Sequence, residues 1–476
     1  KPVSDKKFYK SPVGLKRKVN LHKKIVINDK KAREPGREFF IEVSLVSKGK
    51  LIASDTITYG VVAPLEISPK EYEKCHFSSN YFSAPSYPVW RKKGESIALK
   101  MGISWTQIYD YGWKKAQPHY PGPINFGFKL PSFPRITYCP NIEQERVNEK
   151  WIKDEVPPEA IIPDPLHPGR ITFKIDPYVE YIMAYIRHNH QAIDRVVPSG
   201  LEREIDARTI ELHKKAYKAI KKEFPEIKVG FMLYGLPMNP SKDVDLFLKE
   251  KLYNWCDFID THIYSSSIDW TEWERLKREL KKIGRDNIFL VSTEFSKVGG
   301  MDQIGRSRSM IAAHLDAFAH GMNHIYYFNI INNHPVTKPF LREPTNLGAT
   351  QESGFLFMQR VVRPKVSDDI VLKDYYKKWK WWGYLDNSIM PLLQTMTYYN
   401  LVQNFETASY RKTIYPDENT IGYIFDRGNS TIVALWLEKP VGRKFFVVKT
   451  PSSYTICDLF GRKKKINPYE NTSIIT

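Results

Sequence analysis

The chain of 476 residues has little cysteine and no long hydrophobic run. Its four cysteines, Cys75, Cys139, Cys256 and Cys457, are single and widely spaced, and none belongs to a Cys-x-x-Cys pair. Such spacing disfavours a disulfide framework or a structural metal site. No apolar run approaches the ~20 residues that a membrane-spanning helix needs. We therefore expect no metal site and no membrane span.

Two nucleotide-binding signatures are also missing. No Gly-x-Gly-x-x-Gly follows the first predicted strand, and the sequence contains no phosphate-binding P-loop. These absences weigh against a doubly wound dinucleotide-binding fold. We expect no cofactor.

The sequence has fewer acidic than basic residues. It contains 53 Asp and Glu but 72 Lys and Arg, which gives a formal net charge of +19. This excess favours an anionic partner, such as nucleic acid, an anionic membrane surface or an acidic polysaccharide, although general solubility explains it equally well. The basic residues are scattered in short groups such as "GLKRK" and "GRKKK", and they form no single arm or helix face. That distribution disfavours a nucleic-acid-binding module, and we expect no nucleic-acid partner.

The pattern of the sequence changes along its length. Residues 1–71 are typical of short strands separated by turns, and "FFIEVSLVSKGKLIASDTITYG" predicts a hairpin. We expect an N-terminal β-sandwich here, and because the chain begins with Lys1 we expect a processed or truncated form. Residues 401–476 return to strands, with a hairpin around Arg427 to Asn429, and predict a small C-terminal β-domain.

Residues 72–400 alternate strand-like apolar runs with amphipathic helical segments. Typical pairs are the helix "ARTIELHKKAYKAIKKEF" before the strand "IKVGFMLYG", and the helix "DWTEWERLKRELKKIG" before the strand "NIFLVSTEFS". Repeated units of this kind imply a parallel sheet. Eight such strands predict an α/β fold, a (β/α)8 or TIM barrel, flanked by the two β-regions.

In such a barrel the active site lies at the C-terminal ends of the strands. Acidic residues fall at the ends of the fourth and seventh predicted strands, and two carboxylates about 5–5.5 Å apart are what retaining glycoside hydrolysis requires. One attacks the anomeric carbon, while the other protonates the leaving oxygen and later activates water. The candidates at or near strand ends are Asp110, Trp113, Glu202, Glu204, Tyr234, His262, Tyr264, Glu294, Tyr327 and Asn329.

Four motifs occur in order between Tyr72 and Asn400: "GESIALKMGISWTQIYDYGW", "ARTIELHKKAYKAIKKEFPEIKVG", "DFIDTHIYS" and "LVSTEFS". In this order they resemble the retaining glycoside hydrolases of clan A, and most of all the family 39 enzymes, which include β-xylosidases and α-iduronidases. "DFIDTHIYS" resembles the sixth-strand motif of His followed by Tyr, and "LVSTEFS" resembles the seventh-strand nucleophile motif. The resemblance implies that Glu294 is the nucleophile and that His262 and Tyr264 line the site.

The resemblance also implies that the acid/base residue lies in "VVPSGLERE", where we choose Glu202 and keep Glu204 in reserve. Two positions depart from the clan. Leu201 precedes Glu202 where the clan usually has Asn, and Gln107 takes the place of a common Arg on the second strand. The departures leave three interpretations open: a sugar that is unusual at O2, a misplaced glutamate, or a site that has lost activity.

We therefore predict a secreted, periplasmic or cell-surface retaining glycoside hydrolase that acts on a polysaccharide or oligosaccharide. The net charge of +19 and the missing Asn together suggest an anionic substrate, either sulfated or containing uronate. The alternative is a non-catalytic carbohydrate-binding pseudoenzyme that keeps the glycosidase-like barrel, and the departures at Leu201 and Gln107 are its main support.

Overall fold

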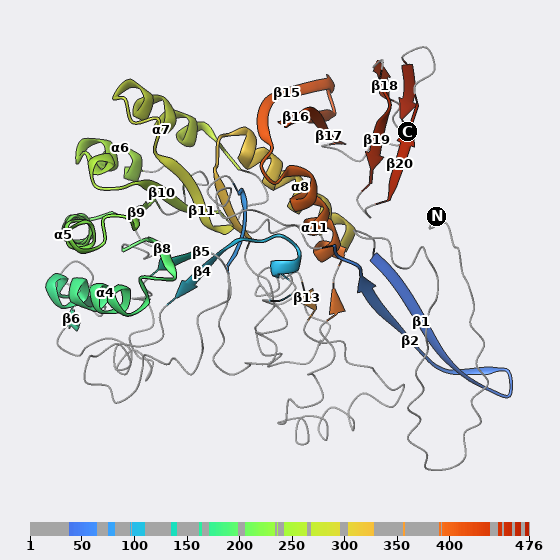
Figure 1. Ribbon diagram of the computed structural model, residues 1–476, viewed down its shortest axis with the longest axis horizontal. Coiled ribbons are helices and arrows are strands. Elements are labelled where there is room, and N and C mark those ends of the chain that lie inside the picture. The colour runs from blue at the N-terminus through green and yellow to red at the C-terminus, as the bar shows by residue number, and fades with distance from the viewer. Residues whose placement is uncertain are drawn as a thin grey trace. The chain divides into compact units, whose positions relative to one another are not determined.

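The computed structural model of the chain contains a parallel barrel with helices around it and several antiparallel β-segments (Figure 1). The residues it describes all belong to one compact unit, Pro35–Thr476. They are residues 38–63, 75–80, 96, 98–109, 135–139, 161–163, 171–198, 205–233, 236, 242–263, 268–295, 303–327, 356–357, 390–391, 393–437, 446–449, 452–458, 462–467 and 472–475. The predicted domain limits, 1–71, 72–400 and 401–476, stay a prediction.

Eight strands form a closed barrel, in the order β10-β11-β12-β3-β4-β5-β8-β9 around the ring. Every neighbouring pair is parallel, and the pairing of β12 with β3 closes the ring. This arrangement is compatible with the (β/α)8 barrel predicted from the sequence. The strands are β3 (Phe77–Asn80), β4 (Trp105–Tyr109), β5 (Arg135–Cys139), β8 (Ile193–Val196), β9 (Lys228–Met232), β10 (Phe258–Ile263), β11 (Phe289–Phe295) and β12 (His324–Tyr327).

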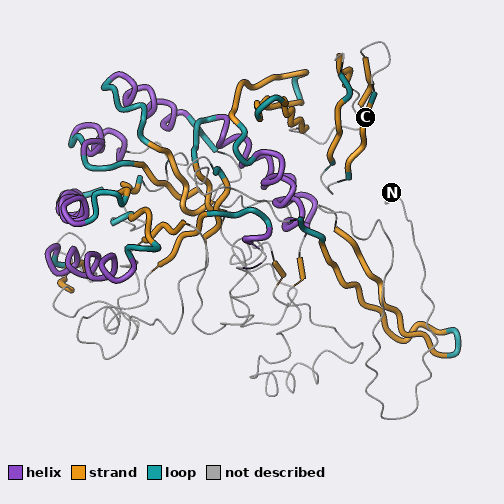
Figure 2. Tube along the Cα trace, viewed as in Figure 1, coloured by secondary structure: helices purple, strands orange, loops and turns teal. Residues whose placement is uncertain are grey.

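Helices precede or connect the strands from β8 to β12 and run along the outside of the barrel (Figure 2). Helix α4 precedes β8, α5 lies between β8 and β9, α6 between β9 and β10, α7 between β10 and β11, and α8 between β11 and β12. A further helix, α11, follows in sequence and packs against α8. The helices are α4 (Ile175–Asn189), α5 (Ala207–Glu223), α6 (Lys242–Lys249), the 3₁₀ helix η5 (Leu252–Asn254), α7 (Thr271–Lys282), α8 (Gln303–Ala319) and α11 (Leu393–Phe405).

Helix α5 shows why these segments fold as amphipathic helices. The carboxylate of Asp206 accepts a hydrogen bond from the backbone N–H of Thr209 at 2.6 Å and so caps the first turn. Lys221 and Lys222 in the last turn complement the negative end of the helix dipole. The buried apolar side chains recur at helical spacing, as Ile210, Leu212, Ala216 and Ile220.

Along the barrel strands, side chains alternate between an apolar cluster inside the barrel and two apolar clusters outside it. One cluster takes residues from β4, β9, β10, β11 and β12, and side chains from so many strands can meet only inside the barrel. Two further clusters join the opposite faces of the strands to the helices. In the larger one, which we call the outer cluster, Ile259 of β10 lies with Leu276 of α7, and in the other Val229 of β9 lies with Leu212 of α5. The interior cluster consists of Cys75, Trp105, Val197, Met232, Phe258, Val291 and Tyr326.

The N-terminal described segment is the hairpin of β1 (Glu38–Ser47) and β2 (Lys50–Gly60). Its two turn residues, Lys48 and Gly49, both have positive φ, at 47° and 75°. A two-residue turn of this kind matches the twist of antiparallel strands. The predicted hairpin is therefore confirmed, whereas the β-sandwich to which we assigned it stays a prediction.

The C-terminal part contains a three-stranded antiparallel sheet of β15 (Ser409–Asp417), β16 (Thr420–Arg427) and β17 (Ser430–Leu437). The turn between β16 and β17 confirms the hairpin predicted around Arg427 to Asn429. The C-terminal β-domain as a unit stays a prediction. The remaining described strands form four short antiparallel pairs: β6 (Ile161–Pro163) with β7 (Ile171–Phe173), β13 (Leu356–Phe357) with β14 (Met390–Pro391), β18 (Phe446–Lys449) with β21 (Thr472–Ile475), and β19 (Tyr454–Cys457) with β20 (Lys463–Ile466).

Candidate active site

Strand β11 carries Glu294 at its C-terminal end. Strict alternation of side chains along this strand would point Glu294 out of the barrel. Val291 belongs to the interior cluster, whereas Leu290 packs in the outer cluster. Because side chains alternate along a strand, Glu294 would share the outer face with Leu290. Phe295 also packs in the outer cluster, although it is five residues after Leu290. An extra residue must therefore interrupt the alternation between them.

The pairing registers locate that extra residue. On one side of β11, Asp260 pairs with Val291 and His262 with Glu294, so two steps on β10 match three on β11. On the other side, Ser292 pairs with Ile325 and Phe295 with Tyr327, again three steps against two. Both registers describe a β-bulge at residues 292–294, and bulges of this kind re-aim side chains beside active sites. The bulge turns Glu294 toward the barrel interior.

Inside the barrel, Glu294 meets His262 of β10. The distance from Nδ1 of His262 to Oε2 of Glu294 is 3.4 Å, and both side chains are buried. The two residues pair across neighbouring strands, so the backbone itself holds them together. The structure thus brings together two of the side chains predicted from the sequence, at the end of the barrel where such folds place their active sites.

Two further polar residues extend this contact. The Thr293 hydroxyl lies 3.2 Å from Nε2 of His262 and donates a hydrogen bond to Oδ2 of Asp260 at 2.5 Å. The backbone N–H of Thr293 donates to the other carboxylate oxygen, Oδ1 of Asp260, at 2.8 Å. Asp260, Thr293, His262 and Glu294 therefore form one buried chain of polar contacts, which we call the Asp260–Glu294 chain.

Burial determines the ionisation of Asp260. It raises the pKa of this carboxyl to about 6, while the charge of His262 and the hydrogen bonds from Thr293 act in the opposite direction. Analysis of the sequence missed both Asp260 and Thr293. The available signal was the polar residues at alternate positions of "DFIDTHIY", which is unusual for a strand that is otherwise buried.

The interior below this chain is filled. The hydroxyls of Thr137 and Tyr326 lie 2.7 Å apart, and both residues are buried. Near the first residues of β10 and β11, the guanidinium of Arg195 stacks on Trp105 at 3.8 Å from the ring centroid and lies 3.2 Å from Nε2 of His324. Among the described residues, these contacts fill the barrel interior toward the N-terminal ends of the strands. Trp105, which could have stacked on a sugar, packs inside the core.

Most of the other candidates lie outside the described residues: Asp110, Trp113, Leu201, Glu202, Glu204, Tyr234, Tyr264 and Asn329. Tyr327 is described and faces the outer cluster, where its ring packs against His314 of α8 and Tyr398 of α11. This placement argues against the predicted role of Tyr327 in substrate binding, and we leave it out of the proposal below. Gln107 is fully buried on β4.

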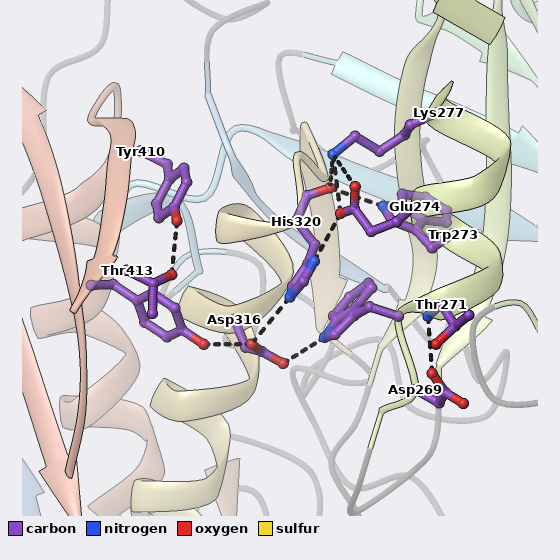
Figure 3. A network of polar contacts seen from close by, with 11 residues as sticks. Asp269, Thr271, Trp273, Glu274, Lys277, Asp316, His320, Tyr410 and Thr413 are labelled. Atoms are coloured by element: carbon purple, nitrogen blue, oxygen red, sulfur yellow. Dashed lines mark hydrogen bonds and ion pairs between the residues drawn. The ribbon is translucent and has the colours of Figure 1, made fainter. Parts of the chain in front are cut away.

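A separate polar network lies outside the barrel and links α7, α8 and β16 (Figure 3). The Trp270 indole and the Tyr423 hydroxyl both donate to Asp316, at 2.7 and 2.5 Å. The ring of His320 stacks on Trp270 with 4.6 Å between centroids, and its Nδ1 lies 2.8 Å from Glu274. These contacts fasten α8 to α7 and to the C-terminal sheet, and they give Trp270 a packing role.

Within the described part of the chain, no group of three His, Cys, Asp or Glu side chains could hold a metal ion. Across the same residues, none of the helices is both long enough and apolar enough to cross a membrane.

Comparison with known proteins gives structural likenesses only. No protein-family model and no curated protein matches the chain. Its solved structural neighbours are glycoside hydrolases. They include the catalytic domain of the GH30 xylanase C from Talaromyces cellulolyticus, with a TM-score of 0.44 and 10% identity over 83% of this chain and 87% of that one.

Two further neighbours have names that describe enzymes acting on uronides. Bacteroides uniformis β-glucuronidase 2 has a TM-score of 0.40 and 10% identity over 92% of this chain, which spans about half (51%) of that enzyme. The GH2 β-galacturonidase from Eisenbergiella tayi has a TM-score of 0.41 and 9% identity over 78% of this chain and 58% of that one. Likenesses this low assign no family, so we take the function from the chain's own residues.

Proposed function

We propose that the chain is a retaining glycoside hydrolase in which Glu294 is the nucleophile. The observation that carries the proposal is the bulge of β11, which turns a buried carboxylate into the C-terminal end of a closed parallel barrel, 3.4 Å from a histidine. A buried carboxylate has a high cost in a barrel core, and a bulge that aims it inward favours a chemical role. The acid/base residue in this proposal is Glu202, with Glu204 in reserve.

The reaction would use these residues in two steps. Glu294 attacks the anomeric carbon while the acid/base glutamate protonates the leaving oxygen, giving a covalent glycosyl-enzyme. The same glutamate, now a base, then activates the water that releases the sugar. His262 orients the Glu294 carboxylate, since its ring fixes the carboxylate from one side. The surrounding strand ends supply the proposed sugar contacts Asp110, Trp113, Tyr234, Tyr264 and Asn329.

We propose an anionic polysaccharide or oligosaccharide as the substrate, sulfated or containing uronate. The net charge of +19 supports this proposal, because a strongly basic protein concentrates polyanions at its surface. Leu201 supports it from the sequence, since it replaces the Asn that would hold a free 2-hydroxyl in the enzymes that the chain resembles.

Product analysis on a panel of neutral, sulfated and uronate-containing polysaccharides tests the function. Glu294→Gln is expected to lower turnover by about 10⁴-fold or more, and azide is expected to restore turnover with a changed product anomer. Glu279→Gln is the matched control. Glu279 lies on α7, outside the barrel, where it forms an ion pair with Lys282 at 2.6 Å, so this change should leave turnover unaltered. Full activity of Glu294→Gln on every cleaved substrate would contradict the proposal.

The same panel assigns the acid/base residue. Glu202→Gln should abolish turnover of substrates with poor leaving groups, while Glu204→Gln should keep it. The reverse result would transfer the role to Glu204.

A non-catalytic carbohydrate-binding barrel is the second candidate. It is favoured by Gln107, which is fully buried on β4 where the resembled enzymes commonly have an Arg. Binding of an oligosaccharide by the wild-type protein without any turnover of the panel would support this candidate in place of the enzyme.

A further inference from the structure

We propose that Asp260 is a positioning residue for Glu294: through the Thr293 hydroxyl it determines which ring nitrogen of His262 carries a hydrogen, and so places a proton between His262 and the carboxylate. The inference rests on the proposed function in one respect, that Glu294 is the nucleophile. The arrangement of hydrogens itself follows from the contacts of the Asp260–Glu294 chain.

The first step is the backbone of the bulge. The pairing registers of β11 with both neighbouring strands skip Thr293. On the β10 side, Val291 and then Glu294 are the paired residues, and on the β12 side Ser292 and then Phe295. Its N–H donates to Oδ1 of Asp260 at 2.8 Å. A buried N–H that leaves a ladder needs another acceptor, and the carboxylate supplies it. Asp260 therefore holds the bulge that aims Glu294 inward.

The second step concerns the Thr293 hydroxyl. This hydroxyl has a single hydrogen, and it is donated to Oδ2 of Asp260 at 2.5 Å. A carboxylate can only accept, so the direction of this hydrogen bond is fixed whenever Asp260 is ionised. The contact of 3.2 Å between the Thr293 oxygen and Nε2 of His262 must then use a hydrogen from the ring. Asp260 thus assigns a hydrogen to Nε2.

The third step follows at the other ring nitrogen. A neutral His262 with its hydrogen on Nε2 would present a lone pair at Nδ1, which faces Oε2 of Glu294 at 3.4 Å. Two acceptors at this distance repel each other unless a proton lies between them. A hydrogen shared between Nδ1 of His262 and Oε2 of Glu294 therefore closes this contact and holds the carboxylate in place.

The test uses Asp260→Asn, which keeps the size of the side chain but reverses one hydrogen bond. The Asn oxygen can still accept from the Thr293 N–H, while its NH₂ group donates to the Thr293 hydroxyl oxygen. The hydroxyl is then free to donate to Nε2 of His262, and the neutral ring carries its hydrogen on Nδ1. This variant should therefore convert His262 from the Nε2–H to the Nδ1–H form.

The tautomer is measured by ¹⁵N NMR of histidine-labelled protein, with the His262 signals among the 12 histidines identified from the spectrum of His262→Gln. This readout needs no substrate, so it separates failure of this inference from failure of the proposed function. An Nε2-protonated ring in the wild type and in Thr293→Ser, and an Nδ1–H ring in Asp260→Asn, are the expected results. The same tautomer in the wild type and Asp260→Asn would overturn the inference.

If Asp260→Asn does not fold, Thr293→Val removes the hydroxyl and should release His262 from a single tautomer; an unchanged Nε2–H ring in that variant would also overturn the inference.

Discussion

Glu294 is placed by one extra residue in its strand, and His262 is the neighbour that meets its carboxylate. Both were predicted from the sequence, since each follows an apolar run at the expected end of a barrel strand. Their distance of 3.4 Å is specific to the fold, because it depends on the parallel pairing of β10 with β11. At the scale of single residues, the barrel thus brings two buried titratable side chains together at the ends of neighbouring strands.

A second buried carboxyl, Glu406, offers a test of stability away from the site. Glu406 follows α11 and accepts a hydrogen bond from the backbone N–H of His76 at 2.7 Å. Burial raises its pKa from 4.5 to about 8, against several hydrogen bonds that lower it. Between these values the folded state holds a proton that the unfolded state has released, so the free energy of unfolding should fall as pH rises from 4.5 to about 8.

Glu406→Gln keeps the acceptor for His76 but cannot ionise. We expect the difference in unfolding free energy between this variant and the wild type to grow with pH across that window, by on the order of a few kcal/mol. Urea unfolding of both proteins at several pH values measures it. A difference that stays constant with pH would show that Glu406 is not buried as a neutral acid.

At the scale of elements, the β-bulge of β11 is the feature on which the site depends. The Ser292 hydroxyl donates to the carbonyl oxygen of Glu294 at 2.9 Å and braces the bulge from the buried side. Ser292→Ala should cost about 1 kcal/mol of stability and lower kcat, because the Glu294 carboxylate is then held less firmly.

Ser430→Ala is the matched control for Ser292→Ala. Ser430 is exposed on β17, and its hydroxyl donates to the carbonyl oxygen of Arg427 at 2.8 Å. This control should lose less stability and keep full kcat. Equal effects of the two variants on kcat would mean that the bulge does not position Glu294.

The elements themselves could largely be predicted from the sequence, whereas the bulge could not. Helix α5 and its strand β9 follow from amphipathic spacing, an Asp cap and an apolar run. In "FLVSTEF", however, a period of two places Glu294 on the same face as Leu290. Its true direction depends on registers with two neighbouring strands that are distant in sequence. Thr293 was missed for the same reason, whereas Asp260 was missed although the alternating polar residues of "DFIDTHIY" pointed to it.

At the scale of the whole molecule, the net charge of +19 predicts how the protein would bind the proposed anionic substrate. Binding of a sulfated polysaccharide should weaken by about tenfold or more when salt is raised from about 0.05 M to about 0.5 M, since salt screens long-range attraction. Isothermal titration at several salt concentrations measures this change. The chemically desulfated form of the same polymer is the control, and equally strong, salt-independent binding of both forms would contradict an anionic substrate.

The central claim is that a carboxylate aimed into the barrel by a strand bulge attacks the substrate. Its most direct test is covalent trapping: the protein is incubated with activated 2-fluoro glycosides of the sugars released in the polysaccharide panel, digested and mapped by mass spectrometry. We predict one glycosyl group per chain, attached to the peptide that contains Glu294, and no such adduct in Glu294→Gln. A glycosyl group on another residue, or turnover with inversion and no adduct, would contradict the account.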